Sequence, residues 1–212
     1  MFLVLALVLS LTACGSAPAQ SVSEPVPSEA PAQLPADTPA SAQETPAAEE
    51  AAPEAENTTL VVYFSGTGNT RGVAERIAKL TGAELLEIVP AEPYAAEDLN
   101  YNDPTTRATV EQNTPDVRQE IANEISLDGC TTLYLGYPIW WGQAPRILST
   151  FVESHDFAGI TVIPFCTSGS SGAGRTGETL GEQAGSGTFL AATRFDGAVS
   201  EAELQTWIDA HS

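Results

Sequence analysis

The sequence has very few basic residues. Its 212 residues include 8 Lys or Arg against 28 Asp or Glu, a formal net charge of −20, and the first basic residue is Arg71. Nucleic-acid binding relies on Lys and Arg to neutralise phosphates, so the acidic excess argues against a nucleic-acid partner. It argues equally against docking on anionic lipid by charge alone. The acidic excess suits a protein partner with a basic docking face, or simply a well-solvated surface.

Cysteine and histidine are also scarce. The chain has three cysteines and two histidines and contains neither Cys-x-x-Cys nor His-Glu-x-x-His. We therefore expect no metal site, and no histidine has a Cys or Ser at a spacing that predicts catalysis. Cys130 and Cys166 fall at opposite ends of neighbouring predicted strands, ~17 Å apart for strands of about five residues. That separation is beyond disulfide reach, so we expect two buried thiols.

The N-terminus has the pattern of an export signal. Residues 2–11 are almost all apolar, a run too short to span a bilayer but of the length of a signal-peptide core. Met1 precedes it directly without Lys or Arg, which leaves open a translation start further upstream. Leu11-Thr12-Ala13-Cys14-Gly15 resembles the lipobox of bacterial lipoproteins. The resemblance implies that residues 1–13 are removed, that Cys14 carries a lipid, and that the protein is extracytoplasmic and anchored to a bacterial cell membrane.

Residues 14–57 lack the material for a core. Eight of the 15 prolines lie between Gly15 and Asn57, where no aromatic residue occurs. Such a stretch buries too little apolar surface to offset its ordering entropy. We expect a disordered linker that holds the following domain, residues 58–212, away from the membrane.

From Thr58 the pattern becomes regular. Apolar runs of strand length alternate with segments of helical spacing, which predicts a parallel sheet covered by helices on both faces. We expect strands at about 60–64, 85–89, 132–136, 160–165 and 188–192. We expect helices over about 69–80, 116–125, from 144, 176–184 and 200–211. Pro164 is unusual within a strand because it has no N–H to donate.

The loop after the first strand is rich in hydroxyls and glycines. It reads Ser65-Gly66-Thr67-Gly68-Asn69-Thr70 and leads into a helix. Glycines let backbone amides turn towards an anion, and the helix N-terminus favours negative charge. The loop has no lysine, so it is no Walker A motif. It predicts a phosphate site.

Residues Val61 to Thr70 closely resemble the phosphate-binding segment of flavodoxins, and the likeness extends over Thr58 to Ser212. The resemblance implies a doubly wound α/β fold with five parallel strands in the order 2-1-3-4-5. It implies FMN as the cofactor, at the switch point between strands 1 and 3, a known example of the rule that ligands bind where strand order reverses. The loop Ser65 to Thr70 would hold its phosphate.

Two further loops are expected beside the flavin. Tyr137-Pro138-Ile139-Trp140-Trp141-Gly142 follows the third strand, and one of its tryptophans suits stacking on a flat ring, with Trp141 slightly favoured and core packing as the alternative. In flavodoxins the loop after the fourth strand closes over the ring, which implies the same for Thr167, Ser168 and Gly169. Tyr101 and Arg107 either line the flavin mouth or, as we favour, only pack in a surface loop.

The resemblance implies electron transfer, because FMN accepts electrons one at a time. Acidic surroundings and a stacked indole both disfavour a negatively charged reduced flavin, so we expect a low potential. One alternative is an FMN-dependent NAD(P)H or quinone reductase, and a second is a flavodoxin-fold binding module without a redox role. Whether the protein is an enzyme stays open, with an electron carrier favoured because no separate nicotinamide-binding motif is visible.

Overall fold

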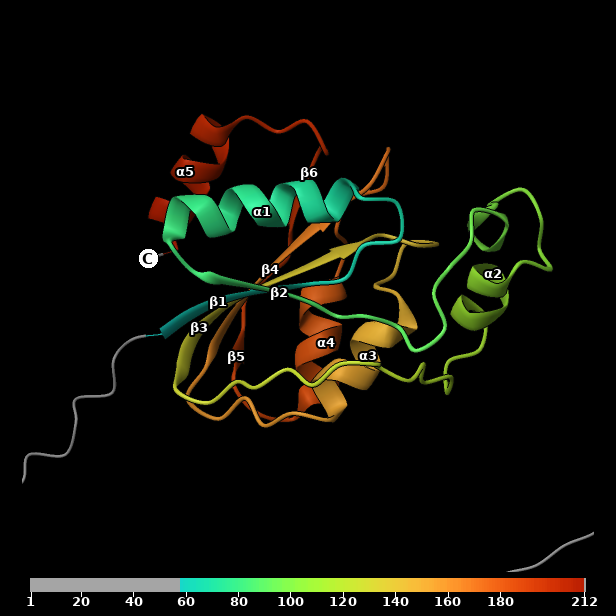
Figure 1. The fold of residues 1–212 in the computed structure, drawn as a ribbon, viewed down its shortest axis with the longest axis horizontal. Coiled ribbons are helices and arrows are strands. Elements are labelled where there is room, and N and C mark those ends of the chain that lie inside the picture. The colour runs from blue at the N-terminus through green and yellow to red at the C-terminus, as the bar shows by residue number, and fades with distance from the viewer. Residues whose placement is uncertain (1–57, 212) are drawn as a thin grey trace, which may run out of the picture. The chain divides into compact units, whose positions relative to one another are not determined.

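The computed structural model describes residues 58–211. The predicted signal peptide, the lipidation site at Cys14 and the linker lie outside the described residues. Strands and helices alternate along the domain (Figure 1). Their order is β1 (Thr58–Tyr63), α1 (Asn69–Thr81), β2 (Glu84–Glu87), the 3-10 helix η1 (Glu97–Leu99), α2 (Arg107–Gln112), β3 (Cys130–Pro138), α3 (Arg146–Glu153), β4 (Thr161–Thr167), α4 (Thr176–Ala184), β5 (Thr188–Phe189), β6 (Thr193–Phe195) and α5 (Glu201–Asp209).

The strands form one parallel sheet in the order β2-β1-β3-β4-β5, which confirms the predicted fold and strand order. Side chains of β1 alternate between the two faces, as strand geometry requires. Leu60 and Val62 pack in one core cluster and Val61 and Tyr63 in the other. Both faces are therefore buried, which explains why the strand reads as a continuous apolar run.

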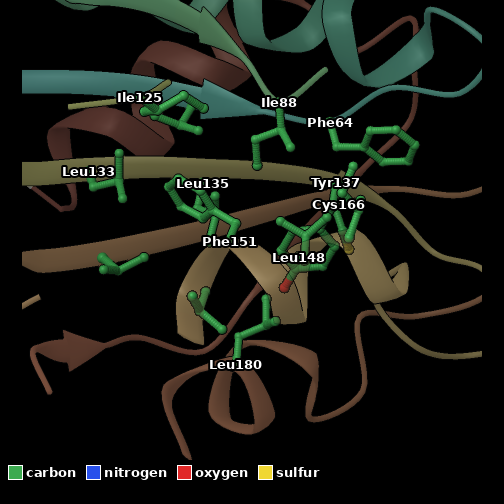
Figure 2. Packing of buried hydrophobic residues seen from close by; sticks show 14 of the residues in the cluster. Phe64, Ile88, Ile125, Leu133, Leu135, Tyr137, Leu148, Phe151, Cys166 and Leu180 are labelled. Carbon is green, nitrogen blue, oxygen red and sulfur yellow. The ribbon is translucent and has the colours of Figure 1, made fainter. Parts of the chain in front are cut away.

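Helices cover both faces of the sheet. α1 and α5 lie on one side, and α3 and α4 on the other (Figure 1). The larger cluster lies beneath α3 and α4, where Leu148 and Phe151 meet the strands (Figure 2). α5 begins as predicted, because the Ser200 hydroxyl accepts a hydrogen bond of 3.2 Å from the amide of Glu203 and so caps the helix.

The fifth strand, predicted over 188–192, covers only Thr188–Phe189 (β5), and a further strand that was not predicted, β6, follows at Thr193–Phe195. β5 pairs with Thr161 and Val162 of β4, and β6 pairs with the end of the same strand, from Phe165 to Thr167. Pro164, which has no N–H for a ladder bond, stands at the level of the break between β5 and β6. The break carries β6 to the carboxyl edge of the sheet, where the loops after the other strands also end.

The helix predicted over residues 116–125 is wrong. This stretch is irregular, and its Ile121 forms an antiparallel bridge with Pro90, just after β2. The amide of Ala91 donates to Glu120 O at 2.8 Å, and the amide of Ala122 donates to Val89 O at 2.7 Å. Pairing with the chain that leaves β2 thus replaces the hydrogen bonds of a helix. The helix of this region is α2, earlier in the β2–β3 connection (residues 88–129).

Cys130 and Cys166 are buried and unpaired thiols. Cys130 stands opposite Thr58 at one end of β3, whereas Cys166 stands opposite Tyr137 near the other end. The strand length between them explains why they form no disulfide. Across residues 58–211, no helix combines the length and apolar character needed to cross a membrane.

Candidate cofactor-binding site

A cavity of about 670 Å³ opens where the loops leave the carboxyl ends of the strands. This edge includes the switch point between β1 and β3, from which the chain continues to opposite sides of the sheet. The volume is within the range of cofactor sites, roughly 300–1,000 Å³. The cavity is lined by Thr67, Asn69, Leu99, Tyr101, Pro138, Ile139, Trp140, Thr167, Ser168, Gly169, Asp196, Gly197 and Ala198.

The β1–α1 loop presents amide groups at one end of this site. Gly68 adopts φ 88°, which glycine tolerates without strain, and its amide donates to the Ser65 hydroxyl at 3.0 Å. Within the described residues the amides of Asn69, Thr70 and Arg71 have no hydrogen-bond acceptor, and no side chain caps the helix. Unpaired first-turn amides and the positive end of the helix dipole favour an anion here.

Gly66 allows the β1–α1 loop (residues 65–70, the phosphate loop) and the loop after β3 (residues 137–142, the aromatic loop) to touch. A Cβ at this position would lie 2.9 Å from Cζ2 of Trp140, closer than any packed side chain tolerates. The glycine therefore gives the indole ring room to reach the β1–α1 loop. Two loops that are more than 70 positions apart in the chain become one wall.

Trp140 forms the inner part of that wall. Its side chain is 3 % exposed and lines the cavity. The indole packs edge-on against Phe64 at 5.6 Å and against Tyr94 at 5.1 Å between ring centroids. Two neighbouring rings thus fix the orientation of the Trp140 indole, and both contacts have the edge-to-face geometry that aromatic pairs prefer.

Trp141 occupies a different place. It is a non-glycine residue at positive φ, 49°, and its ring is tilted against Tyr101 with 4.7 Å between centroids. Trp141 does not line the cavity, whereas Tyr101 does and is 57 % exposed. The structure therefore separates the two tryptophans, with Trp140 in the wall and Trp141 at the rim.

The loop after β4 joins the phosphate loop through a buried hydrogen bond. The hydroxyls of Thr70 and Thr167 are 2.8 Å apart, and both side chains are buried. Ser168 and Gly169 follow Thr167 along the cavity. The guanidinium of Arg194 on β6 donates to Ser168 O at 2.7 Å and to Gly169 O at 3.4 Å. The loop is thus held from both sides.

Sequence reasoning missed the loop after β6. Asp196, Gly197 and Ala198 line the cavity, and a Cβ on Gly197 would lie 3.1 Å from Oδ1 of Asn69. Arg76 of α1 holds the loop by donating to Gly197 O at 2.7 Å and to Val199 O. The turn-forming Asp-Gly pair after a strand was a usable signal, because loops after parallel strands share one edge. Leu99 was missed as well.

The remaining predicted residues lie beside the cavity or away from it. Tyr137 is fully buried, and its hydroxyl is 3.0 Å from that of Thr176, so it belongs to the core. Burial raises the pKa of Tyr137 above its ordinary value. Ser65 and Gly66 line a neighbouring cavity of about 230 Å³. Gly142 lies at another one, beside α3 and α4.

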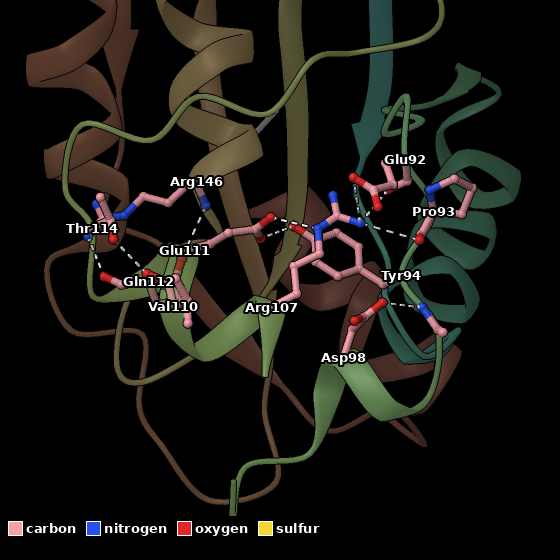
Figure 3. A network of polar contacts seen from close by, with 11 residues as sticks. Glu92, Pro93, Tyr94, Asp98, Arg107, Val110, Glu111, Gln112, Thr114 and Arg146 are labelled. Carbon is pink, nitrogen blue, oxygen red and sulfur yellow. Dashed lines mark hydrogen bonds and ion pairs between the residues drawn. The ribbon is translucent and has the colours of Figure 1, made fainter. Parts of the chain in front are cut away.

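Arg107 lies in the network of Figure 3 rather than at the cavity. Its Nε donates to Glu111 at 2.8 Å, and its guanidinium lies 4.3 Å from the ring centre of Tyr94. The Tyr94 hydroxyl donates to the same carboxylate. Burial and then Glu111 raise the pKa of Tyr94. Since Tyr94 packs on Trp140, the network of Arg107 and Glu111 that holds Tyr94 also helps to hold Trp140 in place.

Gln112 joins the β2–β3 connection to the aromatic loop. Its side chain is 3 % exposed. Nε2 donates to Trp140 O at 3.1 Å and to Ala144 O at 3.2 Å, and Oε1 accepts from the amide of Arg146 at 3.2 Å. One buried amide therefore satisfies three backbone groups of the loop that carries Trp140. Nothing in the local sequence marked this glutamine for that role.

These features fit FMN. The first-turn amides and the hydroxyls of the β1–α1 loop suit a phosphate, and the face beside Trp140 and Gly169 suits a flat ring with polar edges. Among the lining residues Asp196 is the one carboxylate. The fold and the site together define a nucleotide-cofactor-binding α/β domain.

The comparisons narrow that class to a family. The family model described as Flavodoxin matches residues 58–211. The chain belongs to the flavodoxin family. This confirms the resemblance and the fold expected from the sequence, and it supports FMN as the cofactor. A comparison with curated proteins finds no match.

Solved structures agree with this placement. A protein described as a flavoprotein from Bacteroides uniformis is 38% identical, with TM-score 0.69, over 72% of this chain and 98% of that one. One from Bacteroides eggerthii is 36% identical, with TM-score 0.68, over 72% and 96%. A Lactobacillus acidophilus flavoprotein in complex with FMN is 21% identical, with TM-score 0.53, over 72% and 99%, and shows likeness of fold alone.

Proposed function

We propose that this protein is an FMN-binding electron-transfer protein tethered outside the cytoplasmic membrane by a lipid on Cys14. The observation that carries the proposal is the cavity itself, with unpaired helix amides at the end formed by Asn69 and an aromatic wall at Trp140. A phosphate and a flat ring are recognised by these two kinds of surface. Family membership supports the same cofactor.

The residues of this chain have distinct tasks towards FMN. Thr67, Asn69 and Thr70 would bind the phosphate with hydroxyl, amide and main-chain groups. Trp140 would face the ring and keep water from it, and the Ser168–Gly169 segment would offer main-chain groups to its polar edge. Bound FMN would supply electron acceptance and donation in single-electron steps.

The acidic surface supports a basic protein partner. The residues from Thr58 onward carry 20 acidic and 8 basic side chains. Complementary charge speeds association and selects partners. The lipid on Cys14 would place this domain near a membrane-bound donor, with the linker giving it reach. The anchor and the extracytoplasmic location rest on the lipobox-like segment Leu11 to Gly15.

A reductase acting on NAD(P)H or quinones is the second candidate. The exposed ring of Tyr101 lies at the cavity and packs on Trp141, which would suit a planar substrate at the rim. Anaerobic mixing of the FMN-loaded protein with NADPH or NADH distinguishes the candidates. Rapid bleaching of flavin absorbance would favour the reductase, and bleaching only by a reduced protein donor would favour the carrier.

Two experiments test the main proposal. The full chain purified without lipid should bind one FMN on titration, and failure to bind any flavin would leave the second alternative, a binding module. In bacteria, a fatty-acid probe should label the unmodified chain and leave Cys14→Ser unlabelled. Equal labelling of both would refute the anchor while leaving the flavin site untouched.

A further inference from the structure

Three arginines differ from the other basic residues in their partners. All 8 Lys and Arg lie at or after Arg71 and so within the described residues. Five of them form ion pairs with carboxylates: Arg71, Lys79, Arg107, Arg118 and Arg175. Within residues 58–211, Arg76, Arg146 and Arg194 form none. In a chain of net charge −20, an arginine without a carboxylate partner calls for a reason.

Each of the three donates to backbone carbonyls of segments that line the cavity or support its walls. Arg76 donates to Gly197 O, and Arg146 donates to Gln112 O at 2.8 Å. The side chain of Gln112 in turn bonds the aromatic loop at Trp140 O. Arg194 is the most direct case, because both of its acceptors, Ser168 O and Gly169 O, belong to residues that line the cavity. The three arginines without a carboxylate partner thus bind main-chain groups of the segments that build the site.

Besides holding the Ser168 carbonyl, Arg194 also orients the Gly169 N–H, because both groups belong to the same peptide bond. Ser168 C=O and Gly169 N–H belong to one planar trans unit, in which the two bonds point in opposite directions. Fixing the carbonyl on Arg194 therefore fixes the N–H on the other side. Within the part of the chain that the structure describes, the Gly169 amide has no acceptor. Because the exposed residue Gly169 lines the cavity, this amide is available to a ligand bound there.

The charge of Arg194 reaches the buried end of β4. Arg194 stands opposite Cys166 in the β4–β6 register. Burial raises the pKa of the Cys166 thiol to about 12, and the positive charge of Arg194 opposes that rise. The nearest acidic group along the chain is Asp196, whose Oδ1 accepts from the amide of Ala198.

Resting on the proposed function, we propose that Arg194 is a positioning residue that favours reduced over oxidised flavin. It holds the Ser168–Gly169 peptide so that the Gly169 N–H donates to the ring, and it places a positive charge behind that donor. Reduction makes the ring more negative, so both effects strengthen on reduction. Arg194 thereby opposes the lowering of potential expected from the acidic surface.

Three variants of the full chain test this: Arg194→Met, Arg194→Lys and the control Arg175→Met. The control removes an exposed, ion-paired guanidinium that is no part of the cavity. Dissociation constants for oxidised and dithionite-reduced FMN are measured anaerobically for each. Arg194→Met should weaken reduced FMN about tenfold more than oxidised FMN, which lowers the two-electron potential by about 30 mV.

Arg194→Lys should retain most of the preference for reduced FMN, because the charge remains, and Arg175→Met should retain all of it. Equal weakening of both oxidation states by Arg194→Met would mean a purely structural role and would overturn the inference. An equal shift in Arg175→Met would overturn it too, because net charge alone would then explain the result. In both cases the proposed function stands, whereas an unmodified chain that binds no FMN would refute both.

Discussion

The phosphate end and the ring end of the cavity are built in different ways. The phosphate end is one stretch, Ser65 to Thr70, whose conformation follows from its own glycines and the helix it starts. The ring end gathers Trp140, Tyr101 and Gly169 from three loops and holds them through Gln112, Tyr94 and Arg194. Local sequence therefore encodes the first, and tertiary contacts create the second.

Removal of the indole at Trp140 should disturb the ring end most. Trp140→Ala should lower the free energy of unfolding by ~3–5 kcal/mol, as for other large buried side chains. It should also raise flavin fluorescence and the reduction potential, because the electron-rich ring beside the flavin is gone. Denaturant unfolding, fluorescence and dithionite titration measure the three effects.

The matched control is Trp141→Ala, at the rim. Its smaller burial predicts a smaller loss of stability, and flavin fluorescence should change less than in Trp140→Ala. If Trp141→Ala instead gives the larger fluorescence change, the flavin ring lies at the rim and the assignment of the inner wall to it is wrong.

Thr67→Val should weaken binding of the FMN phosphate without affecting binding of the flavin ring. Loss of one hydrogen bond to a charged group costs ~1.5–3 kcal/mol, or roughly 10- to 150-fold in affinity. FMN binding should fall by that factor while riboflavin, which has no phosphate, binds as before. Paired titrations with the two flavins make the measurement, and equal losses for both would place the phosphate elsewhere.

Gln112→Leu should reveal how strongly the β2–β3 connection controls the ring end. It leaves Ala144 O and the amide of Arg146 without this partner, and Trp140 O with the amide of Gln143 as its remaining donor. An unsatisfied buried group costs about 1–3 kcal/mol, so the melting temperature should fall and riboflavin should bind more weakly. Gln143→Leu, at an exposed position close to Trp140 in the chain, is the control and should leave the melting temperature and the riboflavin affinity unchanged. Unaltered riboflavin affinity in Gln112→Leu would make the ring end independent of this clamp.

The smallest expected effect is that of Tyr94→Phe, which keeps the ring against Trp140 and removes only the hydroxyl. Loss of its hydrogen bond to Glu111 should cost about 0.5–1.5 kcal/mol at neutral pH. The folded pKa of Tyr94 is raised above the ordinary 10.0, so its contribution is complete below pH 10 and is lost as pH rises further. Unfolding at pH 8 and 11 should show a smaller pH dependence for Tyr94→Phe than for the unmodified protein.

The contrast between the locally encoded phosphate end and the ring end built by tertiary contacts explains which features can be predicted from the sequence. The strands and α1 follow from apolar runs and from Gly82, which ends the helix. Thr67, Trp140 and Gly169 are predicted near the cofactor because each follows a predicted strand, and all three line the cavity, whereas Trp141, which the sequence slightly favours for stacking, does not. The helix over 116–125 failed because Ile121 and Ile125 have helical spacing yet pair and pack through an extended path. Gln112 and Leu99 depend on contacts across the chain, for which a single sequence carries no signal.

The buried hydrogen bond between Thr70 and Thr167 has a consequence for ligand cooperativity. It joins the helix that would hold the phosphate to the loop that would hold the ring, so ordering one side should order the other. Thermodynamic linkage makes such coupling reciprocal. Inorganic phosphate, in the half of the site it suits, should therefore increase the affinity for riboflavin. In Thr70→Val, which removes this hydrogen bond, the affinity for riboflavin should be the same with and without phosphate in the buffer.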